Sequence, residues 1–236
     1  MSDFNSLTAS ELGDIIGQGK IDPVELTEYF LSQMEKSPVG KKIYSTVTAQ
    51  LAIEQAKASK VRADTGRRLS SLDGVPISWK DLFDIAGFPC EAGSELLAGR
   101  VANKNSEVYS IAEAHGLICL GKTHMSELAF SGLGLNPIRE TPPCFNYPGS
   151  VPGGSSSGAA TSVAFGLAAA GIGSDTGGSV RIPAAWNDLV GFKTTAGRLS
   201  LKGVVPLCSR FDTVGPLVKS VEDAARLFGL MAGGEI

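Results

Sequence analysis

Two glycine pairs that each run straight into a serine dominate this sequence. They are Gly153-Gly154-Ser155 and, a short distance along the chain, Gly177-Gly178-Ser179. Glycine adopts backbone dihedrals that other residues avoid, and turns built from it can direct N–H groups toward a ligand. A serine at the end of such a turn is held where its hydroxyl can react. With Lys80 following the apolar residues 75–79 upstream, the pattern indicates a hydrolase whose general base is not histidine.

The composition is that of a globular protein. The chain has 236 residues, 43% of them hydrophobic, which is enough to bury a sizeable core. A net charge of −3 does not favour nucleic acid or an anionic membrane as a partner. Four widely spaced cysteines predict neither a metal site nor a redox motif, and no cofactor is expected. The N-terminus lacks a signal peptide and the run 163–172 is too short to cross a bilayer, so we expect a cytoplasmic protein.

The periodicity of apolar residues alternates between helix and strand. Helices are predicted at 8–18, from Asp22 onward, and at 52–62, 106–115, 156–165, 179–186 and 220–230. Short apolar strands are predicted at 44–48, 75–79, 117–120, 168–173 and 190–192. This alternation predicts an α/β fold with a largely buried sheet, and we expect a single domain over residues 1–236.

Two familiar motifs compete for the functional assignment. The stretch from Gly116 to Thr123 matches the P-loop pattern G-x-x-x-x-G-K-[ST], but its four middle residues are apolar and favour a buried strand over an open phosphate-binding loop. The stretch from Gly154 to Gly158 matches the nucleophile elbow G-x-S-x-G around Ser156. In that arrangement the histidine follows the serine, whereas both histidines of this chain precede it.

A longer pattern resembles the amidase signature family. It is carried by PGGSSSG at 152–158, GSDTGGSVRIPAA at 173–185 and VGFKTTAGR at 190–198. The resemblance extends to LDGVPISWKD at 72–81, LGKTHMSE at 120–127, GVVP at 203–206 and DTVGPL at 212–217. It implies a mixed, largely buried β-sheet covered by helices on both faces. Because family members are considerably longer, it also implies that this chain is the N-terminal part of one, truncated at its C-terminus.

The resemblance also implies a role for each matching residue. Ser179 matches the family's nucleophile, Ser155 its bridging serine, which follows a cis peptide bond after Gly154, and Lys80 its base. The family's oxyanion donors correspond to the backbone N–H groups of Thr176, Gly177 and Gly178. Supporting positions, expected to fix the two turns by hydrogen bonds or to cap the following helix, are Gly154, Ser156, Asp175 and Arg181.

The chemistry explains why lysine suits this pattern. A serine hydroxyl is a poor nucleophile without a base, and lysine serves as a base only when it is neutral. Its ordinary pKa is about 10.4, and burial lowers that value by penalising the ammonium. Lys80 ends an apolar strand, so it meets this requirement.

We therefore expect an amidase that cleaves a carboxylic amide through an acyl-enzyme. The alternative within the class is a glutamine-hydrolysing amidotransferase A subunit, the one case in which a nucleic-acid partner is expected. Outside the class, the alternatives are a P-loop-like nucleotide-binding protein and a catalytically silent fragment. The expected ligand is a small amide, no membrane partner is expected, and a homodimer is left open.

Overall fold

A six-stranded mixed sheet forms the centre of residues 4–234, the part of the chain that this computed structural model describes. Its order is β1-β3-β2-β4-β6-β5. The strands are β1 (Tyr44–Val47), β2 (Pro76–Lys80), β3 (Ile118–Thr123), β4 (Ala170–Asp175), β5 (Val190–Gly191) and β6 (Thr213–Val218). Strands β3, β2 and β4 are parallel, and the other pairings are antiparallel. The expected mixed α/β class is confirmed.

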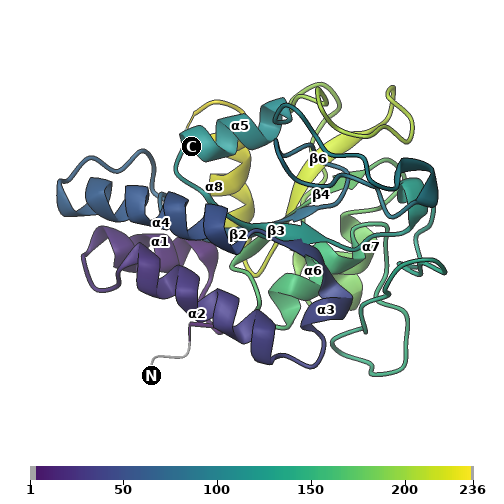
Figure 1. Cartoon of the computed structure of the whole chain (residues 1–236), viewed down its shortest axis with the longest axis horizontal. Helices are drawn as coiled ribbons and strands as arrows, with labels where there is room; N and C mark the ends of the chain where they lie inside the picture. The colour runs from purple at the N-terminus through teal and green to yellow at the C-terminus, as the bar shows by residue number, and fades with distance from the viewer. Residues whose placement is uncertain (1–3, 235–236) are drawn as a thin grey trace.

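Helices surround this sheet. They are α1 (Ala9–Gly17), α2 (Pro23–Lys36), α3 (Gly40–Ile43), α4 (Ala49–Asp64), α5 (Glu107–Ala114), α6 (Ser157–Ala164), α7 (Arg181–Trp186) and α8 (Val221–Met231). Two 3-10 turns, η1 (Glu95–Leu97) and η2 (Glu127–Ala129), lie in the connections. Figure 1 shows α5 and α8 above the sheet and α2, α3 and α6 below it, so both faces are covered.

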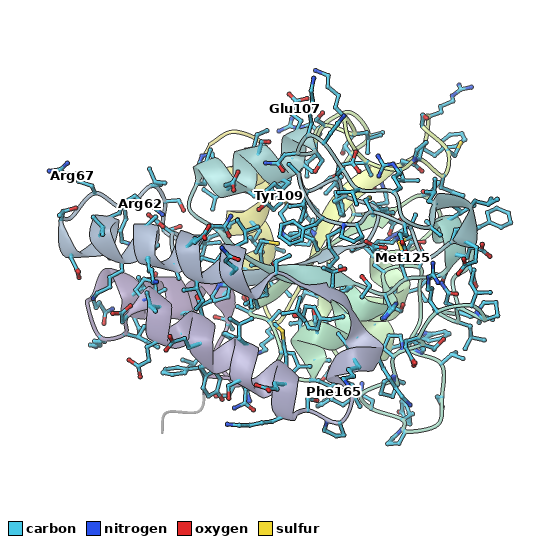
Figure 2. The ribbon with its side chains drawn as sticks, viewed as in Figure 1. Arg62, Arg67, Glu107, Tyr109, Met125 and Phe165 are labelled. Carbon is cyan, nitrogen blue, oxygen red and sulfur yellow. The ribbon has the colours of Figure 1, made fainter. Side chains whose placement is uncertain are left out.

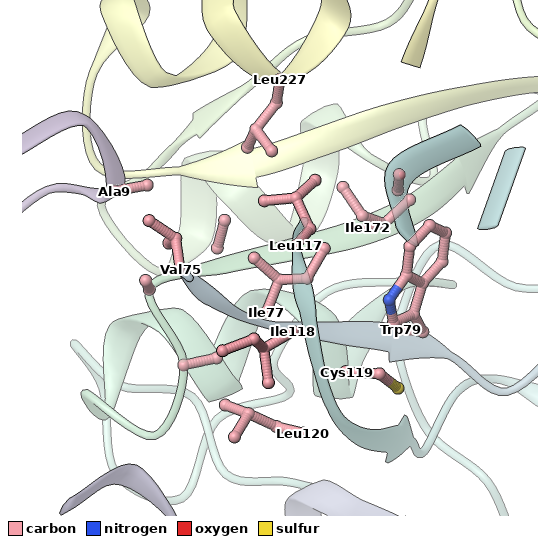
Figure 3. Packing of buried hydrophobic residues seen from close by; sticks show 14 of the residues in the cluster. Ala9, Val75, Ile77, Trp79, Leu117, Ile118, Cys119, Leu120, Ile172 and Leu227 are labelled. Atoms are coloured by element: carbon pink, nitrogen blue, oxygen red, sulfur yellow. The ribbon is translucent and has the colours of Figure 1, made fainter. Parts of the chain in front are cut away.

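The two faces of β4 are packed differently. Gly171 faces α6 so closely that a Cβ there would lie 2.4 Å from the carbonyl oxygen of Ala159, so only glycine fits. Ile172 faces the other way, and Figure 3 shows it in one buried cluster with Ile77 and with Leu227 of α8. This side is completed by aromatic contacts: the ring of Tyr109 on α5, labelled in Figure 2, lies 5.2 Å from that of Trp79.

Three of the differences from the sequence-based expectations bear on the site. Strand β6 was not predicted, because Pro216 in its middle cannot donate a backbone hydrogen bond and argues against a central strand. Helix α7 begins at Arg181 and not at Ser179, because the preceding residues form a turn around Asp175. Strand β3 continues through Gly121 to Thr123, beyond the apolar run that predicted it. Residues 1–3 and 235–236 lie outside the described residues. The expectations that the chain lacks a signal peptide and is truncated at its C-terminus rested partly on them.

Candidate active site

Lys80 is the last residue of β2, and its side chain is fully buried. Its Nζ donates to Ser155 Oγ at 2.6 Å and to Ser174 Oγ at 2.8 Å. Burial lowers the pKa of Lys80 from 10.5 to about 7, and the carboxylates of Asp175 and Asp212 oppose that shift. The amine is therefore available in its neutral form near neutral pH and is in contact with two hydroxyl groups.

Ser155 is held by the turn that precedes α6. The peptide bond between Gly154 and Ser155 is cis, as the family resemblance implied. Gly154 donates its N–H to the carbonyl of Gly132 at 2.8 Å, and the carbonyl of Ser155 accepts from Ser126 at 3.2 Å. A Cβ on Gly154 would lie 2.6 Å from the backbone nitrogen of Gly134. The turn therefore requires glycine at this position because of close backbone packing.

Ser179 lies on the second turn, next to the first. Its carbonyl oxygen accepts the N–H of Ser156 at 3.2 Å, which joins the two serine turns directly. The residue is 8% exposed and borders a pocket of about 220 Å³ together with Gly177. Within residues 4–234 the Ser179 hydroxyl makes no hydrogen bond. The structure thus brings Lys80 and Ser155 into contact but does not form the second expected link, from Ser155 to Ser179.

Asp175 organises the turn that carries Ser179. Its buried carboxylate accepts the N–H of Gly178 at 2.8 Å and that of Val180 at 3.1 Å. Both of its oxygens also accept from the Arg181 guanidinium, at 3.0 Å each. Burial acts to raise the pKa of Asp175, but the Arg181 and backbone donors outweigh it and hold that pKa below the ordinary value.

This arrangement revises the expected set of oxyanion donors. Because the Gly178 N–H already donates to Asp175, it is not available to a ligand in this geometry. In the described part of the chain, the N–H groups of Thr176 and Gly177 donate to no acceptor. Of the three donors that the family resemblance implies, only Gly178 is engaged, in the turn that precedes α7.

Two further serines complete the cluster. Ser174, which no local sequence signal singled out, reaches Lys80 from β4. Ser156 does not cap α6 with its side chain, and its hydroxyl donates instead to the carbonyl of Ser174 at 3.2 Å. Ser156 therefore connects the first serine turn to β4. The signal that could have identified Ser174 is its place beside Asp175 at the end of a strand parallel to the one that ends at Lys80.

Neither of the two competing sequence motifs has the structure that its function requires. Residues 118–123 of the P-loop-like stretch are strand β3, with Lys122 buried between Asp81 Oδ1 and the carbonyl of Pro89, both at 2.8 Å. A lysine engaged in this way cannot reach a phosphate, so the nucleotide-binding alternative is wrong. The elbow around Ser156 has no strand before it. Among residues 4–234, no group of histidine, cysteine and acidic side chains is placed to hold a metal ion, and no helix is long and apolar enough to cross a membrane.

Comparisons with known proteins agree with this architecture. The chain belongs to the Amidase family, whose model matches residues 25–235. It is 37% identical over 241 residues to the A subunit of the glutamyl-tRNA(Gln) amidotransferase of Acinetobacter baylyi, covering 99% of this chain and 47% of that protein. The corresponding protein of Anaeromyxobacter dehalogenans is 41% identical over 225 residues, covering 94% of this chain and 45% of that protein.

Solved structures show the same relationship. A crystal structure described as an amidase superimposes with a TM-score of 0.90 at 33% identity, covering 98% of this chain and 52% of that one. The native peptide amidase of Stenotrophomonas maltophilia gives a TM-score of 0.90 at 29% identity, covering 98% and 49%. The chain thus spans about half the length of the proteins that it matches.

Proposed function

We propose that this chain carries the catalytic centre of an amidase that cleaves a carboxylic amide through an acyl-enzyme on Ser179. The observation that carries the proposal is the buried Lys80 amine, 2.6 Å from Ser155 Oγ, beside a turn that holds Ser179 at the edge of a pocket. A lysine with a pKa of about 7 can act as a general base at neutral pH.

In the proposed reaction the proton moves in two steps. Neutral Lys80 accepts the proton of Ser155, Ser155 accepts that of Ser179, and Ser179 Oγ forms a bond to the amide carbonyl carbon. The N–H groups of Thr176 and Gly177 stabilise the resulting oxyanion, and one such donor lowers a barrier by about 3 kcal/mol. The relay then returns a proton to the leaving nitrogen, the C–N bond breaks, and water hydrolyses the acyl-serine ester.

The pocket beside Ser179 favours an apolar acyl group. Apart from Gly177, Gly132 and two serines, its lining consists of the apolar residues Ala129, Phe130, Ile182 and Leu207. No charged side chain of residues 4–234 lines it, so this half of the site offers no partner to the charged groups of an amino acid. We therefore propose an uncharged aliphatic or aromatic amide as the preferred substrate, hydrolysed in the cytoplasm.

A second candidate function has its own support. The relatives of this chain in Acinetobacter and Anaeromyxobacter are amidotransferase A subunits at 36–41% identity, which favours release of ammonia from glutamine for a partner enzyme. A nucleic-acid partner belongs to this candidate alone.

The experiment is to measure ammonia release by the purified chain from hexanamide, benzamide and glutamine. We expect hydrolysis of the apolar amides, abolished in Ser179→Ala. The matched control is Ser157→Ala, which should keep its rate. Ser157 is buried, and within the described residues its hydroxyl donates only to the carbonyl of His124. Preference for glutamine would favour the second candidate. No ammonia from any amide, with folded protein, would overturn the proposal.

A further inference from the structure

Asp212 is a buried carboxylate immediately before β6, with 6% of its surface exposed. Its Oδ1 accepts the hydroxyl of Thr176 at 2.5 Å. Its two oxygens also accept the backbone N–H groups of Leu207 and Cys208 at 3.0 Å. Within the described residues, Asp212 forms no salt bridge with a lysine, arginine or histidine.

These contacts join two segments that border the same pocket. Thr176 belongs to the turn that leads to Ser179 and precedes Gly177, which lines the pocket. Leu207 lines the pocket from the loop before β6. The two segments lie far apart in the chain, and the Asp212 carboxylate binds Thr176 of the first and both Leu207 and Cys208 of the second. Removing the carboxylate would therefore release Thr176 from the loop that forms the facing wall.

Asp212 also differs electrostatically from the other acids around Lys80. Asp175 is neutralised by Arg181 through two hydrogen bonds, and Asp81, next in sequence to Lys80, is paired with Lys122. Asp212 has no such cation among residues 4–234, and its carboxylate is held only by the Thr176 hydroxyl and by backbone N–H groups. A carboxylate near a buried amine favours the ammonium form, so Asp175 and, to a smaller extent, Asp212 limit how far burial lowers the pKa of Lys80.

We propose that Asp212 is a positioning residue of the active site, which fixes the Thr176–Gly177 donors against the Leu207 wall and whose carboxylate favours the ammonium form of Lys80. The catalytic meaning of this inference rests on the proposed function. Both of its physical parts, however, can be measured without turnover of an amide.

The test compares Asp212→Asn with Thr176→Val and the wild type. The titration of Lys80 is followed by NMR of lysine labelled with ¹³C at Cε, with the Lys80 signal assigned by its loss in Lys80→Met. Asp212→Asn removes the charge and should move the Lys80 titration to lower pH. Thr176→Val removes the hydroxyl link and keeps the charge, so it should leave that titration in place. The matched control is Asp22→Asn, a helix-capping aspartate of α2, which should also leave it in place.

The second readout is the rate at which an alkyl fluorophosphonate labels a serine. Both Asp212→Asn and Thr176→Val should label about tenfold more slowly than wild type, since each loosens the oxyanion donors without removing them. A Lys80 titration that is unchanged or moves to higher pH in Asp212→Asn overturns the proposal. If Asp212→Asn does not fold, the labelling rate of Thr176→Val tests the proposal instead. Labelling of Thr176→Val at the wild-type rate then overturns it. If the wild type itself is not labelled, the proposed function fails, whereas the Lys80 titration still decides the role of the Asp212 charge.

Discussion

Replacing Lys80 by methionine should change how the stability of this protein depends on pH. Lys80 is fully buried, and burial lowers its pKa from 10.5 to about 7. Methionine has a similar unbranched shape and carries no charge. The substitution removes the titrating amine together with its hydrogen bonds to Ser155 and Ser174. The loss of those hydrogen bonds changes the free energy of unfolding by an amount that is nearly constant with pH. The pH dependence of the difference between the two proteins therefore reports on the titration of the amine.

The sign and size of the effect follow from proton linkage. Below about pH 7 the amine is protonated in both states, and the folded state carries the full penalty of a buried ammonium. Between pH 7 and 10.5 the unfolded chain binds more protons than the folded one, so the free energy of unfolding of the wild type rises with pH. The limiting slope is about 1.4 kcal/mol per pH unit. Between about pH 7 and pH 9, the free energy of unfolding of the wild type should therefore rise by about 2 kcal/mol more than that of Lys80→Met.

Urea unfolding at a series of pH values measures this difference. Tyrosine and cysteine groups titrate in both proteins and cancel when the two curves are subtracted. Ser157→Ala serves as a control whose curve should run parallel to that of the wild type. A difference between Lys80→Met and wild type that stays constant from about pH 7 to pH 9 would show that Lys80 keeps an ordinary pKa, and the argument for a neutral base would fail.

Three further substitutions test neighbouring features. Lys122→Ala should lower the free energy of unfolding by about 3–5 kcal/mol because the Asp81 carboxylate is left buried and unpaired; a loss below about 1 kcal/mol, measured by urea unfolding, contradicts the buried pair. Gly158→Ala should destabilise by about 1–3 kcal/mol, since the new Cβ would lie 2.7 Å from two backbone carbonyl oxygens; an unchanged thermal midpoint would refute this contact. Ser174→Ala should slow fluorophosphonate labelling about fivefold through the loss of one hydrogen bond to Lys80, worth about 1 kcal/mol, and labelling at the wild-type rate would exclude that role.

Local signals predicted the features that depend on neighbouring residues. Thr8 caps α1 through a capping box, Asp22 caps α2, and Ser220 caps α8, all as expected from their side chains. The hydrophobicity of the run after Gly116 indicated a buried strand and not a phosphate-binding loop, and this run is strand β3. For the three caps, the decisive interaction lies within three residues of sequence.

Features that depend on distant residues could not be predicted in this way. Ser174 was missed because nothing local distinguishes a serine on a buried strand until Lys80 is placed beside it. The Gly178 N–H is an exception, because its acceptor Asp175 lies only three residues away; the helix expected over 179–186 concealed this turn. The bridging position of Asp212 depends on strand β6, which Pro216 concealed from the sequence pattern. The family motifs supplied the candidate residues but not these contacts.

The most direct test of the account is to identify the residue that an alkyl fluorophosphonate modifies in the purified chain. Intact mass followed by peptide mapping should show a single adduct on Ser179, formed faster as the pH rises through about 7, where Lys80 loses its proton. The adduct should be absent from Ser179→Ala and nearly absent from Lys80→Met, while Ser157→Ala should react like the wild type. An adduct on another serine, or an undiminished adduct in Ser179→Ala, would contradict the assignment of Ser179 as the nucleophile.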